Sequence, residues 1–513
     1  MLQFILNDKN IATNAPKGTT LLDFIRENQH LKGTKSGCRE GDCGACSVLI
    51  GELSSDKMTY QNVTSCITPI GNVQGKHVAT VEGINMNVGE VSNLADVKNA
   101  VYTEGSLKIP NFKFQIPNAG NQALTPVQKA MSDEGATQCG FCTVGFVMSL
   151  TGFCLSEKNA QNDGVIAAID GNICRCTGYK SIERAALKIA EFVEKKDGNA
   201  MNFCIENDIV PLYFSEINER LKAINIDVKN VGEVSNLADV GTAGTVKNGV
   251  KIVGGGTDLY VQRHDEMTNA DIDFLFNDPI LRGVKKIGNR CEIGAAATVS
   301  DFKNSSFVNL AFPNLQKHLK LVSSTPIRNI ATLAGNFVNA SPIGDMTVFF
   351  LALNAILILK NKEDDRREIA LKEFYKGYKT LDKTADEIVE RFYFDLPKTG
   401  NTFFNFEKVC KRTHLDIASV NSAILLTVND LGLIESANLA FGGVAPIPFF
   451  ATKTAAFLIG KPINEATFKA VNDVLQTEIA PISDVRGSEK YKRLLARQLL
   501  LAHFEEIIST LEK

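Results

Sequence analysis

Eight cysteines in two short groups constrain this 513-residue chain more than any other feature of its sequence. The first group begins in SGCREGDCGACSVLI, residues 36–50, and consists of Cys38, Cys43, Cys46 and Cys66. The second group falls in TQCGFCTVGF and GNICRCTGY and consists of Cys139, Cys142, Cys174 and Cys176. The other four cysteines stand alone along the chain, a pattern that favours plain burial of a small apolar side chain. Grouped cysteines in a reducing compartment indicate metal ligation or catalysis rather than disulfides.

The spacing of the first group is C-x4-C-x2-C with a distant fourth cysteine, which is the ligand spacing of plant-type 2Fe-2S clusters. Gly37, Gly41 and Gly44 allow the loop to take unusual backbone angles and to bring bare amides close to sulfur. Four thiolates also bind zinc, but structural zinc sites prefer paired, short-spaced ligands. The spacing therefore favours a 2Fe-2S cluster over zinc.

The second group combines a CxxC motif with a CxC motif, residues 143–173 lying between them. A CxxC motif alone is also typical of redox dithiols and zinc sites. Two thiolates that are separated by one residue cannot share a helix face, so the CxC motif favours a loop between helices. We expect this loop to converge with the first pair on one cluster.

The charge balance and the apolar stretches exclude several classes of partner. Lys+Arg 55 against Asp+Glu 58 indicates neither nucleic acid nor an anionic membrane surface. The N-terminal MLQFILNDKN is too polar for a secretory leader, and TVFFLALNAILIL at 347–359 is shorter than the roughly 20 residues that cross a bilayer. We expect a cytoplasmic protein that binds no nucleic acid and no membrane.

The chain around the cysteines is patterned differently in successive segments. Apolar and polar residues alternate on both sides of an NDKN turn in LQFILNDKNIATNAPKGTTLLDFIREN. The end of this segment has helical spacing, with Thr19 or Thr20 as the cap, and the whole predicts a β-grasp domain. Residues 85–123 lack periodicity and are interpreted as an inserted loop. From 125 to 198 the apolar spacing is helical.

A glycine-rich loop, VKIVGGGTDLY at 250–260, follows a short β-rich run. Its bare amides suit an anion such as a phosphate, which the Thr257 hydroxyl would supplement, although a tight turn explains the glycines equally well. The loop lacks the GxGxxG spacing of a Rossmann nucleotide site.

These motifs together resemble one family. DEGATQCGFCTVGF and GNICRCTGYKSI are similar to the helical second iron–sulfur domain of the molybdenum hydroxylases, the xanthine dehydrogenase and aldehyde oxidase family, and GCREGDCGACSV is similar to its first. KIVGGGTDL and TLAGNFVNASPIGD resemble the two pyrophosphate-binding stretches of that family's FAD domain. The similarity continues through FEKVCKRTHLDIASVN and FGGVAPIP.

The resemblance implies an α+β multidomain protein with a β-grasp ferredoxin-like domain, an all-helical cluster domain, and an α+β FAD-binding domain with a C-terminal flavoprotein subdomain. We expect the boundaries to be a ferredoxin-like 2Fe-2S domain at 1–84, an inserted loop at 85–123, a helical 2Fe-2S domain at 124–198, a linker at 199–229, an FAD-binding domain at 230–400 and the flavoprotein subdomain at 401–513.

The resemblance also implies which residues bind FAD. They are Ile252, Val253, Gly254, Gly255, Gly256, Thr257, Asp258, Leu259, Thr332, Leu333, Ala334, Gly335, Asn336, Asp345 and Lys408. A lysine at the electron-rich edge of the isoalloxazine would stabilise the anionic reduced flavin, and this is the role expected of Lys408. Leu415 stands where animal members of the family have an acid near the flavin.

By this resemblance the chain is the iron–sulfur/FAD small subunit of a bacterial xanthine dehydrogenase-type enzyme. It would pass electrons from molybdopterin on a partner large subunit through two 2Fe-2S clusters to FAD and then NAD+, in a dimer of heterodimers that oxidises hypoxanthine and xanthine to urate. No hydroxylation residue is expected on this chain. The alternatives are the same relay serving an aldehyde or another N-heterocycle hydroxylase, a stand-alone electron carrier, or a zinc protein.

Overall fold

The computed structural model describes residues 1–54, 56–85, 102–103, 106–107, 124–156, 162–196, 198–232, 250–398, 400–412 and 415–511. The insert predicted at 85–123 lies outside this part of the chain, apart from Asn85 and two short paired strands, β6 (Tyr102–Thr103) and β7 (Ser106–Leu107). His414 also lies outside it. Among the described residues, no helix has both the length and the apolar character needed to span a bilayer.

The N-terminal part is the predicted β-grasp domain. A five-stranded sheet in the order β2-β1-β5-β3-β4 packs against a short helical segment in which Thr20 caps the first turn by accepting a hydrogen bond from the Asp23 amide. β1 pairs with β2 as a hairpin and with β5 in parallel, so the strands that are furthest apart in sequence form the centre of the sheet. The elements are β1 (Leu2–Leu6), β2 (Lys9–Thr13), α1 (Leu21–Asp23), β3 (Ser47–Ser54), β4 (Lys57–Thr64) and β5 (His77–Ala79).

The second part is helical, as its apolar spacing predicts. Thr125 and Gln128 form a capping box at the start of the first helix, whose first residue is Pro126. The second helix is buried along almost its whole length and packs on β3 and β4 of the β-grasp sheet. The helices are α2 (Pro126–Asp133), α3 (Thr143–Leu155), α4 (Asn162–Ala168) and α5 (Lys180–Val193).

The segment predicted as a linker forms helices rather than an extended connection. These are α6 (Ala200–Glu206) and α7 (Ile217–Gly232). Ile217 and Leu221 of α7 pack on Ile5 of β1, and Phe214 joins the core of the helical part. The sequence did not predict these helices, because the polar run KKDGNA before Met201 hides the apolar spacing that follows it.

The FAD-binding part is built on an antiparallel sheet in the order β10-β11-β16-β12-β13. Its large core is rich in phenylalanine, with Phe302, Phe349 and Phe350 in mutual edge-on contact. A separate parallel pair, β8 and β9, lies beside the β-grasp domain, where Phe274 and Phe276 pack. The strands are β8 (Lys251–Val253), β9 (Ile272–Phe274), β10 (Val284–Ile287), β11 (Arg290–Gly294), β12 (Ile356–Lys360), β13 (Arg366–Ala370), β14 (Tyr375–Gly377), β15 (Thr380–Leu381) and β16 (Ile388–Asp395).

Short helices connect these strands and carry most of the residues predicted to bind FAD. They are α8 (Thr257–Gln262), α9 (His264–Thr268), α10 (Val299–Asn304), α11 (Ser306–Ala311), α12 (Leu315–Lys320), α13 (Thr325–Arg328), α14 (Leu333–Asn339), α15 (Asp345–Ala352) and α16 (Leu371–Phe374).

The C-terminal part is an antiparallel sheet in the order β17-β18-β19-β20, covered by three helices. The last helix lies across β17 and β18 and buries Leu499, Leu500 and Phe504 in their common core. The elements are β17 (Thr402–Val409), β18 (Val420–Val428), β19 (Ile434–Gly442), β20 (Phe449–Phe450), α17 (Thr452–Leu458), α18 (Glu465–Glu478) and α19 (Glu489–Leu511).

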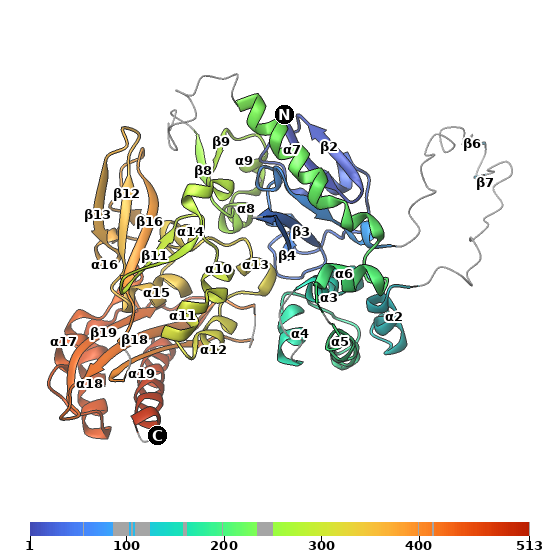
Figure 1. Ribbon diagram of the computed structural model, residues 1–513. Helices are drawn as coiled ribbons and strands as arrows, with labels where there is room; N and C mark the ends of the chain where they lie inside the picture. Colours follow the sequence, from blue (N-terminus) through green and yellow to red (C-terminus); the bar gives the residue numbers. More distant parts are fainter. Residues whose placement is uncertain are drawn as a thin grey trace.

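The four parts are arranged so that the FAD-binding part contacts all the others (Figure 1). In Figure 1 the β-grasp domain, in blue, lies above the helical cluster domain, and the FAD-binding part lies beside both, with α13 facing them. The C-terminal sheet and α19, in red, extend from the far end of the FAD-binding part. The cysteine groups therefore lie on one side of the molecule and the glycine-rich loop lies toward the middle.

Candidate functional site

The first cysteine group is assembled by the β3–β4 hairpin and the loop before it. Ser47 pairs with Thr64, which places Cys46 and Cys66 at the same end of the hairpin, where both are buried. The Cys38 sulfur hydrogen-bonds those of Cys43 and Cys66, and the Cys46 sulfur hydrogen-bonds that of Cys66. All four predicted ligands therefore meet at one place.

Backbone amides of the loop point at these sulfur atoms. The Cys38 Sγ accepts hydrogen bonds from the amides of Glu40 (3.3 Å) and Cys43 (3.4 Å), and the Cys43 Sγ accepts one from the Cys38 amide (3.4 Å). A Cβ on Gly37 would lie 2.7 Å from the Cys43 Sγ, and Gly41 has a φ of +79°. The loop is therefore shaped for negatively charged sulfur, as bound thiolates require.

The second group lies where two loops meet at the ends of α3 and α5. The sulfur atoms of Cys139 and Cys176 are 3.6 Å apart, and the Cys142 sulfur hydrogen-bonds that of Cys174. The Thr177 amide donates to the Cys174 Sγ (3.4 Å). Burial and the neighbouring Cys174 raise the pKa of the Cys142 thiol to about 12, so a metal that binds there must displace a proton.

Both groups fit a two-iron cluster. In the part of the chain that the structure describes, no three His, Cys, Asp or Glu side chains converge on one ion position. The sulfur atoms of the second group meet in two pairs and those of the first group form one series of contacts, and a 2Fe-2S cluster is held by four thiolates shared between two irons. Cys139 and Cys176 are exposed, whereas Cys46 and Cys66 are buried.

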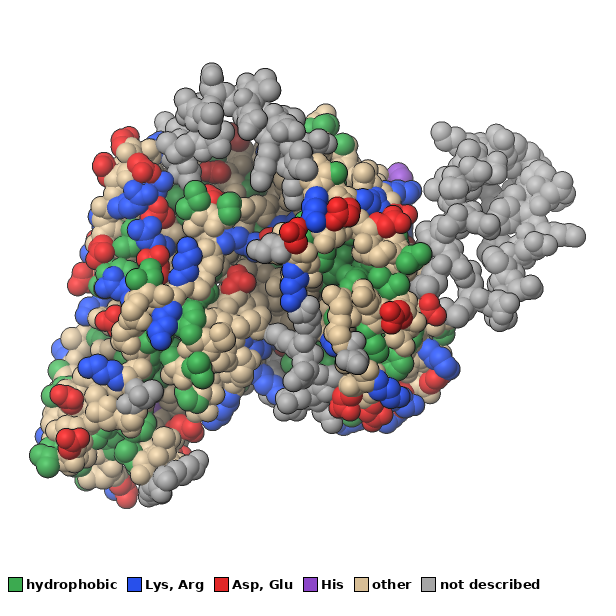
Figure 2. Space-filling view, viewed as in Figure 1, with side chains coloured by type: hydrophobic (Ala, Val, Ile, Leu, Met, Phe, Trp, Pro, Cys, Tyr) green, Lys and Arg blue, Asp and Glu red, His purple; other side chains and the backbone are tan. Residues whose placement is uncertain are grey.

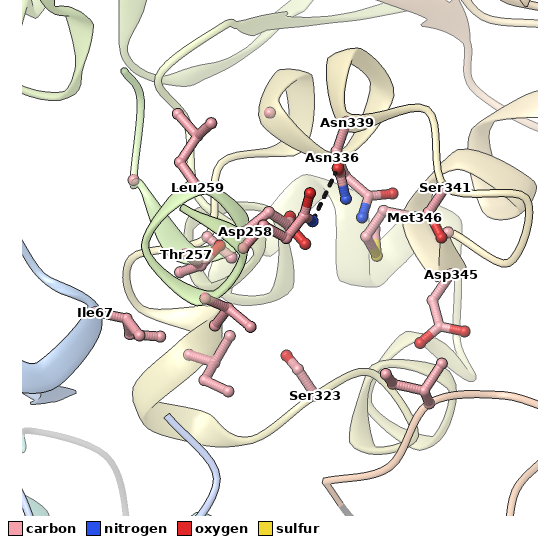
Figure 3. Close-up of a pocket in the computed structure, with 18 of the residues that line it drawn as sticks. Ile67, Thr257, Asp258, Leu259, Ser323, Asn336, Asn339, Ser341, Asp345 and Met346 are labelled. Carbon is pink, nitrogen blue, oxygen red and sulfur yellow. Dashed lines mark hydrogen bonds between the residues drawn. The ribbon is translucent and has the colours of Figure 1, made fainter. Parts of the chain in front are cut away.

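A cavity of about 810 Å³ lies between the glycine-rich loop, α14 and the start of α15 (Figure 3). In Figure 3 the side chains of Asp258, Asn336 and Asp345 surround the same open space. Most residues predicted to bind FAD line this cavity, namely Ile252, Gly254, Gly255, Gly256, Thr257, Asp258, Leu259, Thr332, Gly335, Asn336 and Asp345. Val253, Leu333, Ala334 and Lys408 of that prediction are not among the lining residues.

The glycines bring the backbone close to α14. A Cβ on Gly254 would lie 2.8 Å from the Thr332 hydroxyl, and a Cβ on Gly255 would overlap the Ile330 carbonyl oxygen. Gly256 has a φ of +85°, which side-chain-bearing residues rarely adopt. Thr332 in turn caps α14 by accepting a hydrogen bond from the Gly335 amide (3.3 Å). The resulting cradle of bare amides and a hydroxyl fits a diphosphate.

Lys408 is buried behind Asp345 and does not face the cavity. Its Nζ donates to the Asp345 Oδ2 (2.7 Å) and to the Leu321 carbonyl (2.8 Å), and its side chain is 1% exposed. Asn421 donates to the other carboxylate oxygen, Oδ1, at 2.6 Å. The lysine charge therefore reaches the cavity only through a carboxylate that it neutralises, which differs from the direct flavin contact expected from the sequence.

Two further charged groups lie at the cavity wall. Burial raises the pKa of the Asp258 carboxyl, and the nearby Lys379 opposes this shift. Burial also lowers the pKa of the Lys379 ammonium, which contacts the carbonyl and side chain of Asn339. These shifts indicate a partly dry site in which desolvation disfavours both charges, and the attraction between the two groups offsets only part of that effect.

Several lining residues were not predicted. Glu40 and Asp42 reach the cavity from the first cysteine loop, and Ser323, Lys379 and Arg412 reach it from the FAD-binding part and the loop after β17. Arg412 pairs with Asp42 across the domain boundary (3.7 Å). Leu415 also lines the cavity and has a φ of +52°. Glu40 and Asp42 lie inside the motif GCREGDCGACSV, and Arg412 and Leu415 lie inside FEKVCKRTHLDIASVN. These local motifs do not show that the two segments meet at one cavity.

Sequence profiles of known domains match the chain in the same order. They are the 2Fe-2S iron–sulfur cluster binding domain at residues 4–71, the [2Fe-2S] binding domain at 116–187, the FAD binding domain in molybdopterin dehydrogenase at 225–398 and the CO dehydrogenase flavoprotein C-terminal domain at 406–507. Two 2Fe-2S domains and an FAD-binding domain on one chain define an iron–sulfur flavoprotein that transfers electrons. Together with the relatives described next, these domains make the chain similar to the iron–sulfur/FAD part of the molybdenum hydroxylases.

The relatives include xanthine dehydrogenases. That of Emericella nidulans is 27% identical and is matched over 100% of this chain and 39% of its own length, and that of Blastobotrys adeninivorans is 28% identical over 100% of this chain and 41% of its own length. The chain thus spans about two fifths of these relatives. The structure of reconstituted CO dehydrogenase from Oligotropha carboxidovorans aligns with a TM-score of 0.46 and 24% identity, over 49% of this chain and 87% of that chain.

Proposed function

We propose that this chain carries electrons from a molybdopterin-binding partner, through two 2Fe-2S clusters and FAD, to NAD+ in the oxidation of hypoxanthine and xanthine to urate. The relatives named above are xanthine dehydrogenases, and this favours a purine substrate for the whole enzyme. When bound, the clusters carry single electrons and FAD collects two of them for release as hydride. This chain's residues hold these groups, order them and control access to them.

The order of the relay is supported by the positions of the two cysteine groups. Cys139 and Cys176 are exposed, so the second group lies where a partner can reach it. The first group is joined to the second by a hydrogen bond from the Ile173 amide to the Cys43 carbonyl (3.0 Å). Glu40 and Asp42 of the first loop line the cavity. Electrons would therefore enter at the second cluster and reach FAD from the first.

A partner surface around the second group is supported by exposed apolar side chains. Phe141 lies between Cys139 and Cys142 and is 46% exposed, and Ile173 and Tyr179 flank the CxC motif at 37% and 38%. Large apolar side chains beside redox ligands are typical of a docking surface that excludes water. We assign this surface to the molybdopterin-binding partner, in a dimer of heterodimers.

The acceptor end is supported by basic residues at the cavity. Lys379, Arg412 and Arg486 line it, and Figure 2 shows the molecule hollowed between its two halves with charged side chains of both signs at the rim. Cations beside an open cavity suit the diphosphate of a dinucleotide acceptor. FAD, with its diphosphate at the glycine-rich loop, would leave its ring toward Leu415, and NAD+ would approach from that side.

The second cysteine group adjoins the first, and the loop of the first group lines the cavity that holds the glycine cradle. This single observation carries the proposal. The first test needs only this chain. The purified protein should contain about four irons and one FAD, and anaerobic NADH should bleach the flavin and then the cluster absorption. Zinc in place of iron would refute the relay. A protein that contains iron and FAD but is not reduced by NADH would refute only the choice of NAD+ as the acceptor.

The substrate is tested with the partner present. The complex with the molybdopterin-binding chain should form urate and NADH from xanthine, and it should contain molybdenum. Turnover of an aldehyde or another N-heterocycle in place of xanthine would keep the relay and change the substrate. A chain that retains its cofactors but binds no molybdenum partner would favour a stand-alone electron carrier.

A further inference from the structure

The four residues that lead into Cys174, namely Asp170–Ile173, contact both other cofactor-binding parts of the molecule. They connect α4 to the CxC loop of the second cluster group. Although they lie in the helical domain, their bonds reach the first cysteine loop and the FAD-binding part. We call this segment the junction stretch. The sequence marks it only as the start of GNICRCTGY.

Asp170 joins the junction stretch to the FAD-binding part through a buried ion pair. Its Oδ2 lies 2.6 Å from Arg328 Nη2, and the two side chains are 3% and 1% exposed. Its Oδ1 accepts a hydrogen bond from the Thr325 amide (2.7 Å) at the start of α13. Both carboxylate oxygen atoms of Asp170 are thus bonded to groups of the FAD-binding part.

Arg328 extends this connection to the wall of the FAD cavity. Its Nη1 donates to the carbonyl oxygens of Val322 (2.7 Å) and Ser323 (3.0 Å). Val322 and Ser323 both line the cavity, and Ser323 holds a φ of +45° there. One guanidinium therefore connects a residue four positions from Cys174 with the turn that shapes the flavin site.

Asn172 joins the same stretch to the first cysteine loop. Its Nδ2 donates to the Gly44 carbonyl (3.2 Å), between the ligands Cys43 and Cys46. Its Oδ1 accepts from the Ser149 hydroxyl (2.7 Å), which itself accepts from Asn62 Nδ2 (2.7 Å). The side chains of all three residues are buried.

The same series of hydrogen bonds continues from Asn62 to the FAD-binding part. The Asn62 carbonyl accepts from Asn329 Nδ2 (2.8 Å), and Asn329 Oδ1 accepts from the Ser300 hydroxyl (2.6 Å). Asn329 follows Arg328 directly, so both branches from the junction stretch end on the same turn of α13. The three cofactor-binding parts thus share one closed polar network.

The contacts leave little freedom between the parts. A Cβ on Gly171 would lie 2.5 Å from Pro326, and a Cβ on Gly44 would overlap the Gly171 carbonyl oxygen. The side-chain groups named here are paired except Asn62 Oδ1, and such a buried polar network favours one arrangement, because displacement would leave further charged or polar groups unpaired. Apolar packing alone would tolerate small sliding motions at this boundary.

We propose that Asp170 and Asn172 are positioning residues that fix the two cluster sites and the flavin cavity relative to one another. The inference rests on the proposed relay, in which electrons cross from the second group to the first and then to FAD. In that relay the rate depends on cofactor separation, and this network is what holds that separation. Neither residue is a cysteine ligand, and neither lines the FAD cavity.

The test uses the full chain loaded with iron and FAD, in two variants and one control. Asp170→Asn keeps the shape of the side chain and removes the charge opposite Arg328, and Ser149→Ala removes the hydroxyl that links Asn172 to Asn62. Glu387→Gln is the control, because it breaks an ion pair of the same length with Arg367 (2.6 Å), whose side chain is 41% exposed, on the far side of the FAD-binding part. Pulsed electron paramagnetic resonance then measures the magnetic coupling between the reduced clusters, and between a cluster and the flavin radical.

Both variants should retain their iron and each cluster's own signal, but should show weaker or more widely distributed coupling than the unsubstituted chain and the control. Electron equilibration from cluster to flavin after a reducing flash should be slower than in the unsubstituted chain and in the control, because the rate of electron transfer falls as the cofactors move apart. Cluster midpoint potentials, which a change at the ligands themselves would move, should stay unchanged.

Three results decide the question. Native coupling in both variants, or an equal change in Glu387→Gln, overturns the positioning role. If Asp170→Asn loses its clusters, Ser149→Ala decides alone, because it removes no charge. An unsubstituted chain without two 2Fe-2S signals overturns the proposed relay together with this inference, whereas native coupling in the variants overturns this inference only.

Discussion

Asp345 shows how the charge of one residue can be masked by its neighbours. It faces the cavity, yet Lys408 and Asn421 occupy both of its oxygen atoms from behind. The pair is close to neutral, so the expected electrostatic stabilisation of reduced flavin by Lys408 is largely cancelled by the carboxylate. The sequence motif FEKV singled out Lys408, but a local motif could not show that its partner, Asp345, lies 63 residues away.

Changing either member of this pair should move the flavin potential in opposite directions. Asp345→Asn leaves an uncompensated positive charge near the cavity and should raise the two-electron potential of bound FAD, whereas Lys408→Met leaves a negative charge and should lower it. A net interaction of about 1 kcal/mol corresponds to roughly 20 mV for two electrons. Spectroelectrochemical titration measures both shifts, and the double variant should return toward the native potential. Shifts of the same sign in both single variants would contradict the paired arrangement.

Two buried histidines, His318 of α12 and His503 of α19, make the contact between the FAD-binding part and the C-terminal part sensitive to acid. His318 Nε2 lies 3.1 Å from Asn405 Oδ1, Asn405 Nδ2 lies 3.0 Å from His503 Nδ1, and His503 Nε2 lies 2.9 Å from the Ser422 hydroxyl. Because the Ser422 hydroxyl donates to the Ala440 carbonyl, it accepts from His503, and both imidazoles fit as neutral rings with the proton on Nε2. Burial lowers the pKa of His318 to about 4 and that of His503 to about 3.

The stability of the chain should therefore fall as the pH is lowered below about 6.5. Between the folded-state values and about 6.5 the unfolded chain binds protons that the folded chain does not, so unfolding is favoured by up to about 1.4 kcal/mol per pH unit for each histidine. Above about 6.5 both states are neutral and the effect vanishes. Thermal unfolding from pH 4.5 to 7.5 measures the slope, and His503→Gln should reduce it. The exposed His30→Asn is the control and should leave the slope unchanged.

At the scale of elements, the loop between β8 and α8 illustrates what spacing can predict. Three consecutive glycines after a short strand suited a phosphate cradle or a tight turn equally well, and only the family resemblance favoured the cradle. The structure places them against Thr332 and Ile330 at the start of α14. The β-grasp order and the helical cluster domain were predicted from the sequence, because turn residues, caps and period are local signals. The helices at 199–229 and the approach of Glu40 and Asp42 to the cavity were not predicted. These features depend on contacts between residues that are far apart in sequence, and no local pattern reports them.

Closing the cradle should abolish FAD binding while the clusters remain. A Cβ at position 255 would overlap a backbone carbonyl oxygen, which cannot rotate away, so Gly255→Ala should displace the loop from α14. We expect a loss of about 1–3 kcal/mol in overpacking and at least a tenfold weaker affinity for FAD. Flavin released on gel filtration and fluorescence titration measure it. Gly432→Ala, at an exposed turn with a φ of +74° and open space around it, tests a glycine that is strained but not crowded, and it should retain FAD.

At the scale of the whole molecule, the β-grasp domain and the FAD-binding part are also connected by a second group of charges, which lies beside Asn329. Glu52 of β3 pairs with Arg282 of the FAD-binding part and lies 3.6 Å from Lys76 Nζ, and Lys76 lies 4.9 Å from the ring centroid of Phe276. Lys76 is buried, and desolvation lowers its pKa to about 8 although Glu52 opposes the shift. The carboxylate thus balances two cations at a boundary that aligns the first cluster with the flavin cavity.

Removing this carboxylate should loosen the boundary without unfolding either part. Glu52→Gln leaves Lys76 and Arg282 without a counter-charge, and because the Glu52 side chain is one-third exposed we expect a loss of about 1–3 kcal/mol rather than the larger value of a fully buried pair. The single thermal transition should broaden or divide into two, with flavin lost at the lower temperature. Glu27→Gln, which breaks an exposed pair with Lys32, should shift the transition by less than about 1 kcal/mol. A Glu52→Gln protein that unfolds like the control would mean that apolar packing of Phe274 and Phe276 on the β-grasp core, rather than charge, holds the first cluster beside the flavin.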